Sequence, residues 1–176
     1  LGDETFYSVA PVSLPVDVMG VGALVEKVGV GSNYSCALSL NGMFECWGEA
    51  AFGQLSSHEF VEYQEIPMEF LGLGNSGVSK IGLGDQHSCI VTQEGGLKCS
   101  GLNDRGQLGL GNTDNLSLAD DTYLAYSDIE HVGSGYRHTC AITSSGDVRC
   151  WGLNDNGQLG DSSFDDSLVP VDVINF

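Results

Sequence analysis

The sequence predicts an all-β protein built from three tandem repeats that stack face to face. Near-copies of one stretch begin at Val28, Ile81 and Val132, 51 to 53 residues apart, and repeats of this kind bury their apolar faces mainly against their neighbours. The 25 glycines among 176 residues are typical of short strands joined by tight turns. The central strands are apolar on both faces, as in radially stacked blades whose faces are both covered.

The repeat phase can be followed along the whole chain. Residues 1–18 parallel residues 159–173, because both contain Leu-Gly-Asp, a following Phe and a final Pro-Val-Asp-Val. We expect residues 1–18 to be the outer strand of a preceding repeat, 19–80 to be repeat 1, 81–131 repeat 2, and 132–176 repeat 3 with its following outer strand. An open array of this kind exposes blade faces and strand edges. We therefore expect a piece of a longer chain, or copies that associate through those ends.

Each repeat contains a hairpin whose turn is located by its cysteines. The six cysteines form three pairs ten positions apart, and a glycine follows the midpoint of every pair. A three-residue hairpin loop needs a left-handed residue at its third position, which glycine adopts without a Cβ clash. The loops are therefore expected at residues 40–42, 93–95 and 144–146, with Gly42, Gly95 and Gly146 at their third positions.

The same register places the two cysteines of each pair directly opposite each other. At a non-hydrogen-bonded site the Cα atoms are roughly 4.5 Å apart, which a disulfide can bridge. The expected disulfides are Cys36–Cys46, Cys89–Cys99 and Cys140–Cys150. Zinc is disfavoured, because only two sulfurs meet in each repeat and structural zinc normally has four ligands.

Disulfides indicate an oxidising compartment, so we expect a secreted or cell-surface protein. Two sequons agree with that compartment, and Asn33 and Asn115 are the candidate N-glycosylation sites.

The charge balance restricts the partners. Six Lys and Arg against 24 Asp and Glu give a formal net charge of −18, which repels phosphate backbones and anionic membranes, so no nucleic-acid partner is expected. No apolar run approaches roughly 18 residues, so no membrane insertion is expected. The acidity favours solubility in a saline or extracellular setting. Clustered carboxylates also suit Ca²⁺, so weak calcium binding is the only cofactor hypothesis.

A glycine-rich loop follows each hairpin and carries a family resemblance. Residues 101–109 read GLNDRGQLG, residues 152–160 read GLNDNGQLG, and residues 48–55 are a looser copy, GEAAFGQL. Together with a preceding G-x-x-H-[ST]-x-x-[IV] pattern, these loops resemble the repeat of the regulator of chromosome condensation. In that family similar units form a seven-bladed β-propeller of four-stranded blades. The resemblance implies about three four-stranded antiparallel blades, an open or partial propeller.

The resemblance also implies structural roles for residues at equivalent positions of the repeats. These are the histidines before the cysteine, the glutamines of the loop, and the tryptophans that precede a glycine. We expect Ser100, which replaces tryptophan in the middle copy, to make a weaker contact. The equivalent positions are His87, His138, Gln54, Gln107, Gln158, Trp47 and Trp151.

No catalytic motif is present. Neither G-x-S-x-G nor H-E-x-x-H occurs, and no glycine-rich loop precedes a helix with lysine. We expect no enzyme, with neither catalytic nor metal-binding residues. The Asn-Asp pairs Asn103-Asp104 and Asn154-Asp155 are expected to hold turns through side chain-to-backbone bonds.

Two functions remain. The first is a non-catalytic extracellular scaffold that binds a protein or glycan; the second is a segment of an extracellular filament or surface assembly built by repeat-to-repeat association. Guanine-nucleotide exchange or chromatin binding, which the family's founding member implies, is disfavoured by the disulfides and by the net charge. The acidic segments 56–80 and 112–131 should hold the outer strands and loops. Binding residues concentrate on the loops of a rigid scaffold, so a partner site is expected there; the alternative is that these segments form a solvated acidic edge.

Overall fold

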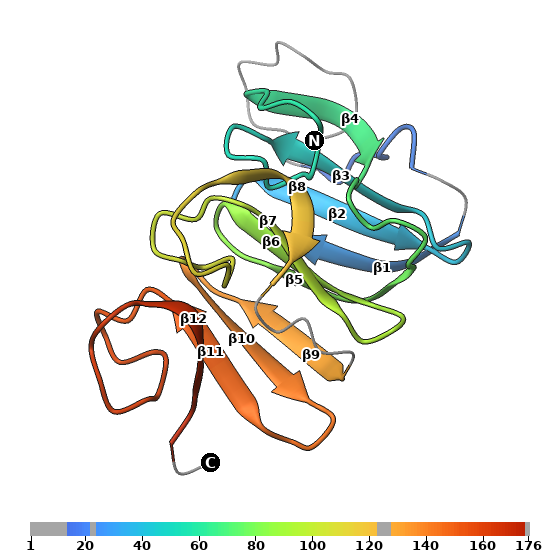
Figure 1. The fold of residues 1–176 in the computed structure, drawn as a ribbon. Helices are drawn as coiled ribbons and strands as arrows, with labels where there is room; N and C mark the ends of the chain where they lie inside the picture. The colour runs from blue at the N-terminus through green and yellow to red at the C-terminus, as the bar shows by residue number, and fades with distance from the viewer. Residues whose placement is uncertain (1–13, 22–23, 123–127, 175–176) are drawn as a thin grey trace.

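The computed structural model describes residues 14–21, 24–122 and 128–174, and it contains three four-stranded antiparallel sheets (Figure 1). Each sheet is a meander in which every strand pairs with the next strand along the chain. Blade 1 consists of β1 (Val25–Val30), β2 (Tyr34–Ser39), β3 (Phe44–Glu49) and β4 (Tyr63–Glu69). Blade 2 consists of β5 (Val78–Leu83), β6 (His87–Thr92), β7 (Leu97–Gly101) and β8 (Leu116–Asp121). Blade 3 consists of β9 (Ile129–Ser134), β10 (His138–Thr143), β11 (Val148–Gly152) and β12 (Ser167–Asp172).

The predicted fold class is confirmed. The blades lie side by side, with β1 against β5 and β5 against β9, while β4, β8 and β12 form the opposite edges (Figure 1). No helix of the described residues is long and apolar enough to cross a membrane.

The central hairpins have the turn that the glycines predict. In blade 1 the amide of Ser39 donates to the carbonyl of Met43 at 2.8 Å, which leaves three loop residues between them. The third of these, Gly42, has a φ of 86°, and its counterparts have φ values of 81° and 89°. Glycine is required there because an L side chain is strained at positive φ.

Each hairpin carries one disulfide between directly paired cysteines. The Cα atoms of each pair are 4.1 Å apart, and no described cysteine is free. All three bonds lie within a single blade, so they hold hairpins closed and do not join the blades to one another. The joined pairs are Cys36–Cys46, Cys89–Cys99 and Cys140–Cys150.

Two cores hold the blades together, because the central strands alternate between two covered faces. In β6, Ile90 packs into the core between blades 1 and 2, and its neighbour Cys89 packs into the core between blades 2 and 3. Phe44 and Phe70 fill the first core with ring centroids 5.2 Å apart. Burying both faces in this way is the physical reason for the continuous apolar runs.

The predicted repeat boundaries need correction. The limits after residues 80 and 131 fall inside β5 and β9, because the similarity between the repeats extends back to Val25, Val78 and Ile129, at which β1, β5 and β9 begin. Of the outer strand expected at residues 1–18, residues 1–13 lie outside the described part. Residues 14–18 form no strand, since none of the described strands pairs with them.

Candidate binding surface and the joints between blades

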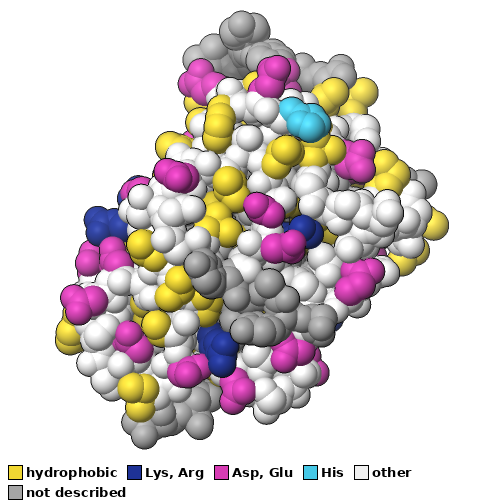
Figure 2. Space-filling model, in the orientation of Figure 1, with side chains coloured by type: hydrophobic (Ala, Val, Ile, Leu, Met, Phe, Trp, Pro, Cys, Tyr) yellow, Lys and Arg dark blue, Asp and Glu magenta, His cyan; other side chains and the backbone are white. Residues whose placement is uncertain are grey.

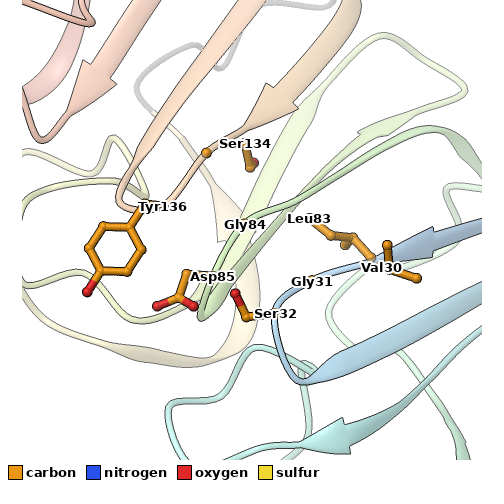
Figure 3. Close-up of a pocket in the computed structure, with 9 residues that line it drawn as sticks. Val30, Gly31, Ser32, Leu83, Gly84, Asp85, Ser134 and Tyr136 are labelled. Atoms are coloured by element: carbon orange, nitrogen blue, oxygen red, sulfur yellow. The ribbon is translucent and has the colours of Figure 1, made fainter.

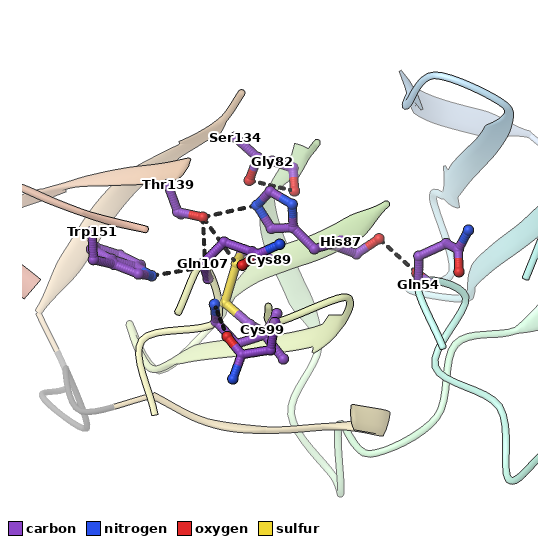
Figure 4. Close-up of a disulfide and its surroundings, with 12 residues drawn as sticks. Gln54, Gly82, His87, Cys89, Cys99, Gln107, Ser134, Thr139 and Trp151 are labelled. Carbon is purple, nitrogen blue, oxygen red and sulfur yellow. Dashed lines mark hydrogen bonds between the residues drawn. A yellow bond between two sulfur atoms is a disulfide. The ribbon is translucent and has the colours of Figure 1, made fainter. Parts of the chain in front are cut away.

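Successive blades are joined at a main-chain carbonyl of the glycine-rich loop. The carbonyl of Gln107 accepts hydrogen bonds from Thr139 Oγ1 and from Trp151 Nε1, each at 2.9 Å (Figure 4). At the preceding joint, the carbonyl of Gln54 accepts from Ser88 Oγ at 2.7 Å. The glutamine positions of the repeat therefore mark where one blade docks on the next.

The glutamine side chains hold their own loops in shape. The Oε1 atoms accept hydrogen bonds from the main-chain amides two residues earlier, at 3.0 Å for Gln54 and at 2.9 Å for Gln107 and Gln158. Gln54 and Gln107 are also fully buried. By fixing the loops, the side chains of Gln54 and Gln107 hold their main-chain carbonyls in place for the next blade.

The asparagines of the loop act as predicted. The Oδ1 atom of Asn103 accepts from the amide of Leu108 at 2.9 Å, and Asn154 does the same for Leu159. Both asparagines are fully buried. Such side chain-to-backbone bonds replace regular pairing in a tight loop.

Histidine links the second and third blades. His87 is fully buried, and its Nε2 lies 2.9 Å from Thr139 Oγ1. Because the Thr139 hydroxyl donates to Gln107, Nε2 must carry the hydrogen and donate to it. Burial, together with a smaller contribution from the charge of the neighbouring His138, lowers the pKa of His87 to about 3. His87 is therefore a neutral part of the joint and no acid–base catalyst near neutral pH.

The same position is filled differently in the other two blades. Tyr34 occupies it in blade 1, where its hydroxyl donates to the carbonyl of His87 at 2.6 Å and burial raises its pKa. His138 occupies it in blade 3, where it is about half buried and desolvation lowers its pKa. Two of the three side chains thus reach into the following blade.

The tryptophan–glycine pair has a clear steric role. Trp151 is fully buried, and a Cβ added to Gly152 would lie 2.5 Å from the carbonyl oxygen of Arg137. Ser100, at the tryptophan position of blade 2, is buried with no hydrogen-bond partner for its hydroxyl among the described residues. The joint between blades 1 and 2 therefore lacks the indole hydrogen bond.

A pocket of about 330 Å³ lies where three loops from the three blades meet (Figure 3). Each loop joins the first two strands of its blade and begins with a glycine whose amide donates to a carbonyl three residues later, at 2.9 Å. Ser32, Asp85 and Tyr136 are the equivalent residues that follow these glycines. The repeat therefore places a different polar side chain from each blade around one opening.

The pocket combines an acidic group with an aromatic one. Tyr136 is 60% exposed, and the Arg137 guanidinium lies 5.1 Å from the centre of its ring. Arg137 also forms an ion pair with Asp104 of blade 2. Asp85 contributes a carboxylate to the lining (Figure 3). An exposed ring beside hydrogen-bonding groups suits recognition of another molecule.

A second ion pair crosses the same joint. Arg105 of blade 2 lies 3.0 Å from Asp166 of blade 3, whose hydrogen bond and charge raise the pKa of Arg105. Because this ion pair is partly exposed, screening by solvent weakens its contribution to stability. Acidic side chains outnumber basic ones on the face shown in Figure 2.

The predicted site residues fall into distinct places. Asn33 and Asn115 are exposed; Asn33 Nδ2 donates to Glu49 at 3.1 Å, and Asn115 Oδ1 accepts from the amide of Asn103 at 2.8 Å. Their glycosylation stays a prediction. Within the described ranges, no group of three or more His, Cys, Asp or Glu could hold a metal ion, and the calcium hypothesis stays untested.

No sequence motif singled out the residues that line this pocket. The pocket lies on the loops that join the first two strands of each blade, away from the acidic outer segments where binding residues were expected. The only signal was their position after the glycines at 31, 84 and 135, which recurs in all three repeats.

Three meander blades joined through loop carbonyls define a repeat protein of the β-propeller class. Residues 78–107 and 129–158 match one sequence profile of the regulator of chromosome condensation (RCC1) repeat, and residues 145–176 match a second. The chain belongs to the RCC1 repeat family.

Similar proteins include the ultraviolet-B receptor UVR8 of Arabidopsis thaliana, which is 28% identical over 158 residues, covering 89% of this chain and 36% of UVR8. The probable E3 ubiquitin-protein ligase HERC3 of Homo sapiens is 29% identical over 151 residues, covering 85% of this chain and 14% of HERC3. The chain thus spans little more than a third of the first relative and much less of the second.

Solved structures share the fold. Yeast RCC1 (Prp20), in a complex with Kap60, superposes with a TM-score of 0.78 at 23% identity, covering 86% of this chain and 37% of that one. Human WBSCR16 gives a TM-score of 0.72 at 22% identity, covering 85% of this chain and 39% of that one.

Proposed function

We propose that the chain is a non-catalytic, extracellular binding module whose partner is a protein that contacts the pocket around Asp85 and Tyr136. The observation that carries this proposal is the convergence of three loops, one from each blade, on a single opening. Binding residues concentrate on loops held by a rigid scaffold, and exposed aromatic rings are frequent anchors of interfaces.

The chemistry of the pocket favours a polar or basic segment of the partner. Asp85 offers a carboxylate and Tyr136 a partly exposed ring, while the formal charge of −18 attracts cationic surfaces at long range. The solved complex of yeast RCC1 (Prp20) with Kap60 supports a protein as the kind of partner. A glycan remains the alternative ligand for the same loops.

The three disulfides support the extracellular location, because such bonds persist in oxidising compartments. The exposure of Asn33 and Asn115 agrees with glycosylation there. Enzymatic removal of N-glycans from the protein secreted by its native cells should lower its mass. A smaller decrease in mass for the Asn33→Gln or the Asn115→Gln variant would assign a glycan to that site. An unglycosylated protein retained in the cytosol would contradict this part of the proposal.

Photo-crosslinking tests the binding surface. A photoreactive amino acid replaces Tyr136 in one variant and Phe60, which is 55% exposed and outside the pocket, in a matched control. After irradiation in native extracellular fluid, mass spectrometry should identify a partner joined to position 136 and absent from position 60. Adducts of equal yield at both positions, or none at position 136, would contradict the proposed surface.

A second function, assembly by repeat-to-repeat association, is favoured by the face of blade 1 that points away from blade 2. Val28 and Val30 are 71% and 72% exposed there. Their counterparts in blade 2, Ile81 and Leu83, pack into the core between blades 1 and 2.

A further inference from the structure

Lys80 is the one basic side chain among the described residues that forms no ion pair. All six Lys and Arg residues of the chain lie in the described ranges. The other five pair with carboxylates: Lys27 with Glu26, Lys98 with Asp121, Arg105 with Asp166, Arg137 with Asp104 and Arg149 with Asp172. Lys80 is half buried and donates no hydrogen bond to any described residue. In a chain with 24 acidic residues, its ammonium is still free to pair with a group from outside.

The equivalent lysine of blade 1 shows what this position does when it is satisfied. Lys27 and Lys80 are the third residues of β1 and β5, and each follows a shift in the register of its strand. Lys27 Nζ donates to the carbonyl of Ser79 across the joint between blades 1 and 2, at 3.2 Å, and pairs with Glu26 beside it. Blade 2 has Ser79 in place of that glutamate, and Lys80 makes no such contact with blade 3. The joint between blades 2 and 3 therefore lacks a bond that the preceding joint has.

A pocket of about 350 Å³ lies where this bond is missing. Its lining comes only from blades 2 and 3, which pack directly on each other through β5 and β9 (Figure 1). Lys80 is paired with Val91, which packs into the core between these blades, so Lys80 lies on the face of blade 2 that blade 3 covers. Gln93, on the next turn, also lines the pocket, and its side-chain amide bonds to no described residue. Two unused donors thus share one opening.

We propose that this pocket binds a carboxylate group of a ligand, which pairs with Lys80 Nζ and accepts a second hydrogen bond from the Gln93 amide. Hydrogen bonds between charged groups are about twice as strong as those between neutral groups, and partial burial reduces their screening by solvent. The pocket lies at the beginning of β5 and β9, whereas Asp85 and Tyr136 follow the ends of these strands. The proposal therefore concerns a surface other than the binding surface proposed above.

The charges around the pocket favour a monoanion. Lys80 supplies a single positive charge, and Glu130, which is exposed, also lines the opening. A dianionic phosphate would meet repulsion from Glu130 and from the net charge of −18. A free carboxylic acid and an acidic side chain of a protein present the same group, so the experiment has to distinguish these two sources.

Nuclear magnetic resonance of the full chain tests the proposal, because the chain has only three lysines. Reductive methylation with ¹³C-formaldehyde labels each lysine and keeps its charge; Lys→Arg variants assign the signals. Sodium propionate, or a blocked Gly-Glu-Gly peptide, is added at constant ionic strength. We expect a saturable shift of the Lys80 signal alone, since Lys27 and Lys98 are already paired. Tighter binding of the peptide than of propionate indicates a protein carboxylate as the source, and the reverse order indicates a free acid.

Substitutions assign the site, with backbone amide signals of the ¹⁵N-labelled protein as the readout. Lys80→Gln should weaken propionate binding by at least about tenfold, whereas Lys80→Arg should retain it. Glu130→Gln should strengthen binding about threefold, because it removes a competing carboxylate. Lys98→Gln, outside the pocket, is the matched control and should bind as the wild type does. A dispersed amide spectrum establishes that each variant is folded.

Two results would overturn the proposal. The first is a Lys80 signal that does not saturate, or that shifts no more than those of Lys27 and Lys98. The second is undiminished binding by Lys80→Gln. Crosslinking at position 136 involves none of these residues, so failure of the carboxylate site and failure of the proposed binding surface are observed separately.

Discussion

The indole Nε1–H of Trp151 donates a hydrogen bond of 2.9 Å to the main-chain carbonyl of Gln107, across the joint between blades 3 and 2. The acceptor is a backbone atom, and the donor belongs to a fully buried ring. One residue thus supplies both apolar area and a directional bond to the neighbouring blade. This combination fixes the relative position of the two blades more closely than apolar burial alone, since the hydrophobic effect has no direction.

Removing the indole hydrogen bond should weaken the chain measurably. Trp151→Phe is expected to lower the free energy of unfolding by about 1–2 kcal/mol, and Trp151→Ala by about 3–5 kcal/mol because it also leaves a cavity. Urea unfolding followed by circular dichroism measures both values. Trp47→Phe, at the equivalent position of blade 1, is the matched control for the loss of unfolding free energy, since the Trp47 indole donates to no described residue. An equal loss in Trp47→Phe and Trp151→Phe would contradict the importance of the carbonyl.

Features of the hairpins were predictable from the sequence because they are local. A three-residue loop requires a left-handed third residue, so the position of Gly146 determines which cysteines face each other. The bonds from Asn154 to its own loop were predictable for the same reason.

The joints and the pocket were not predictable, because neither depends on a local pattern. The carbonyl of Gln107 would accept a hydrogen bond whatever its side chain, so the sequence carries no sign of its use. The pocket brings Asp85 and Tyr136 together from loops in different blades. That meeting depends on the angle between sheets, which no motif specifies.

Alanine substitutions at three glycines should separate steric clash from backbone strain. Gly152 has a φ of 100°, and an added Cβ would approach a main-chain oxygen within 2.5 Å; Gly146 has a φ of 89° with open space around it. At Gly133 the space is open and φ is unremarkable. We expect losses of unfolding free energy above about 2 kcal/mol for Gly152→Ala, about 1 kcal/mol for Gly146→Ala and close to zero for Gly133→Ala. Equal losses at Gly152 and Gly146 would show that the close approach does not matter.

The disulfides should contribute similar stabilities, because all three close loops of the same length. Replacing both cysteines of one pair by alanine is expected to lower the free energy of unfolding by roughly 2–3 kcal/mol. Chemical denaturation without reductant measures each loss. Alkylation followed by mass spectrometry should add no label to the denatured, unreduced protein and six labels after reduction. Six labels before reduction would contradict the disulfides.

Acid should destabilise the chain through His87. Its pKa is about 3 in the folded protein against an ordinary value of 6.5, so between these values the unfolded state binds the extra proton. The resulting stability is fully present above pH 6.5 and is lost as the pH falls toward 3, with a slope that approaches about 1.4 kcal/mol per pH unit. Urea unfolding at a series of pH values measures this slope.

The contribution of His87 is isolated by substitution, because lowering the pH also neutralises carboxylates and reduces the net negative charge. His87→Gln keeps a donor for Thr139 but cannot take up a proton, so its stability should fall less steeply between pH 6.5 and 4 than that of the wild type. His58→Gln, at an exposed site, is the matched control and should retain the wild-type slope. If His87→Gln and wild type lose stability in parallel, the buried imidazole is not the group that senses acid.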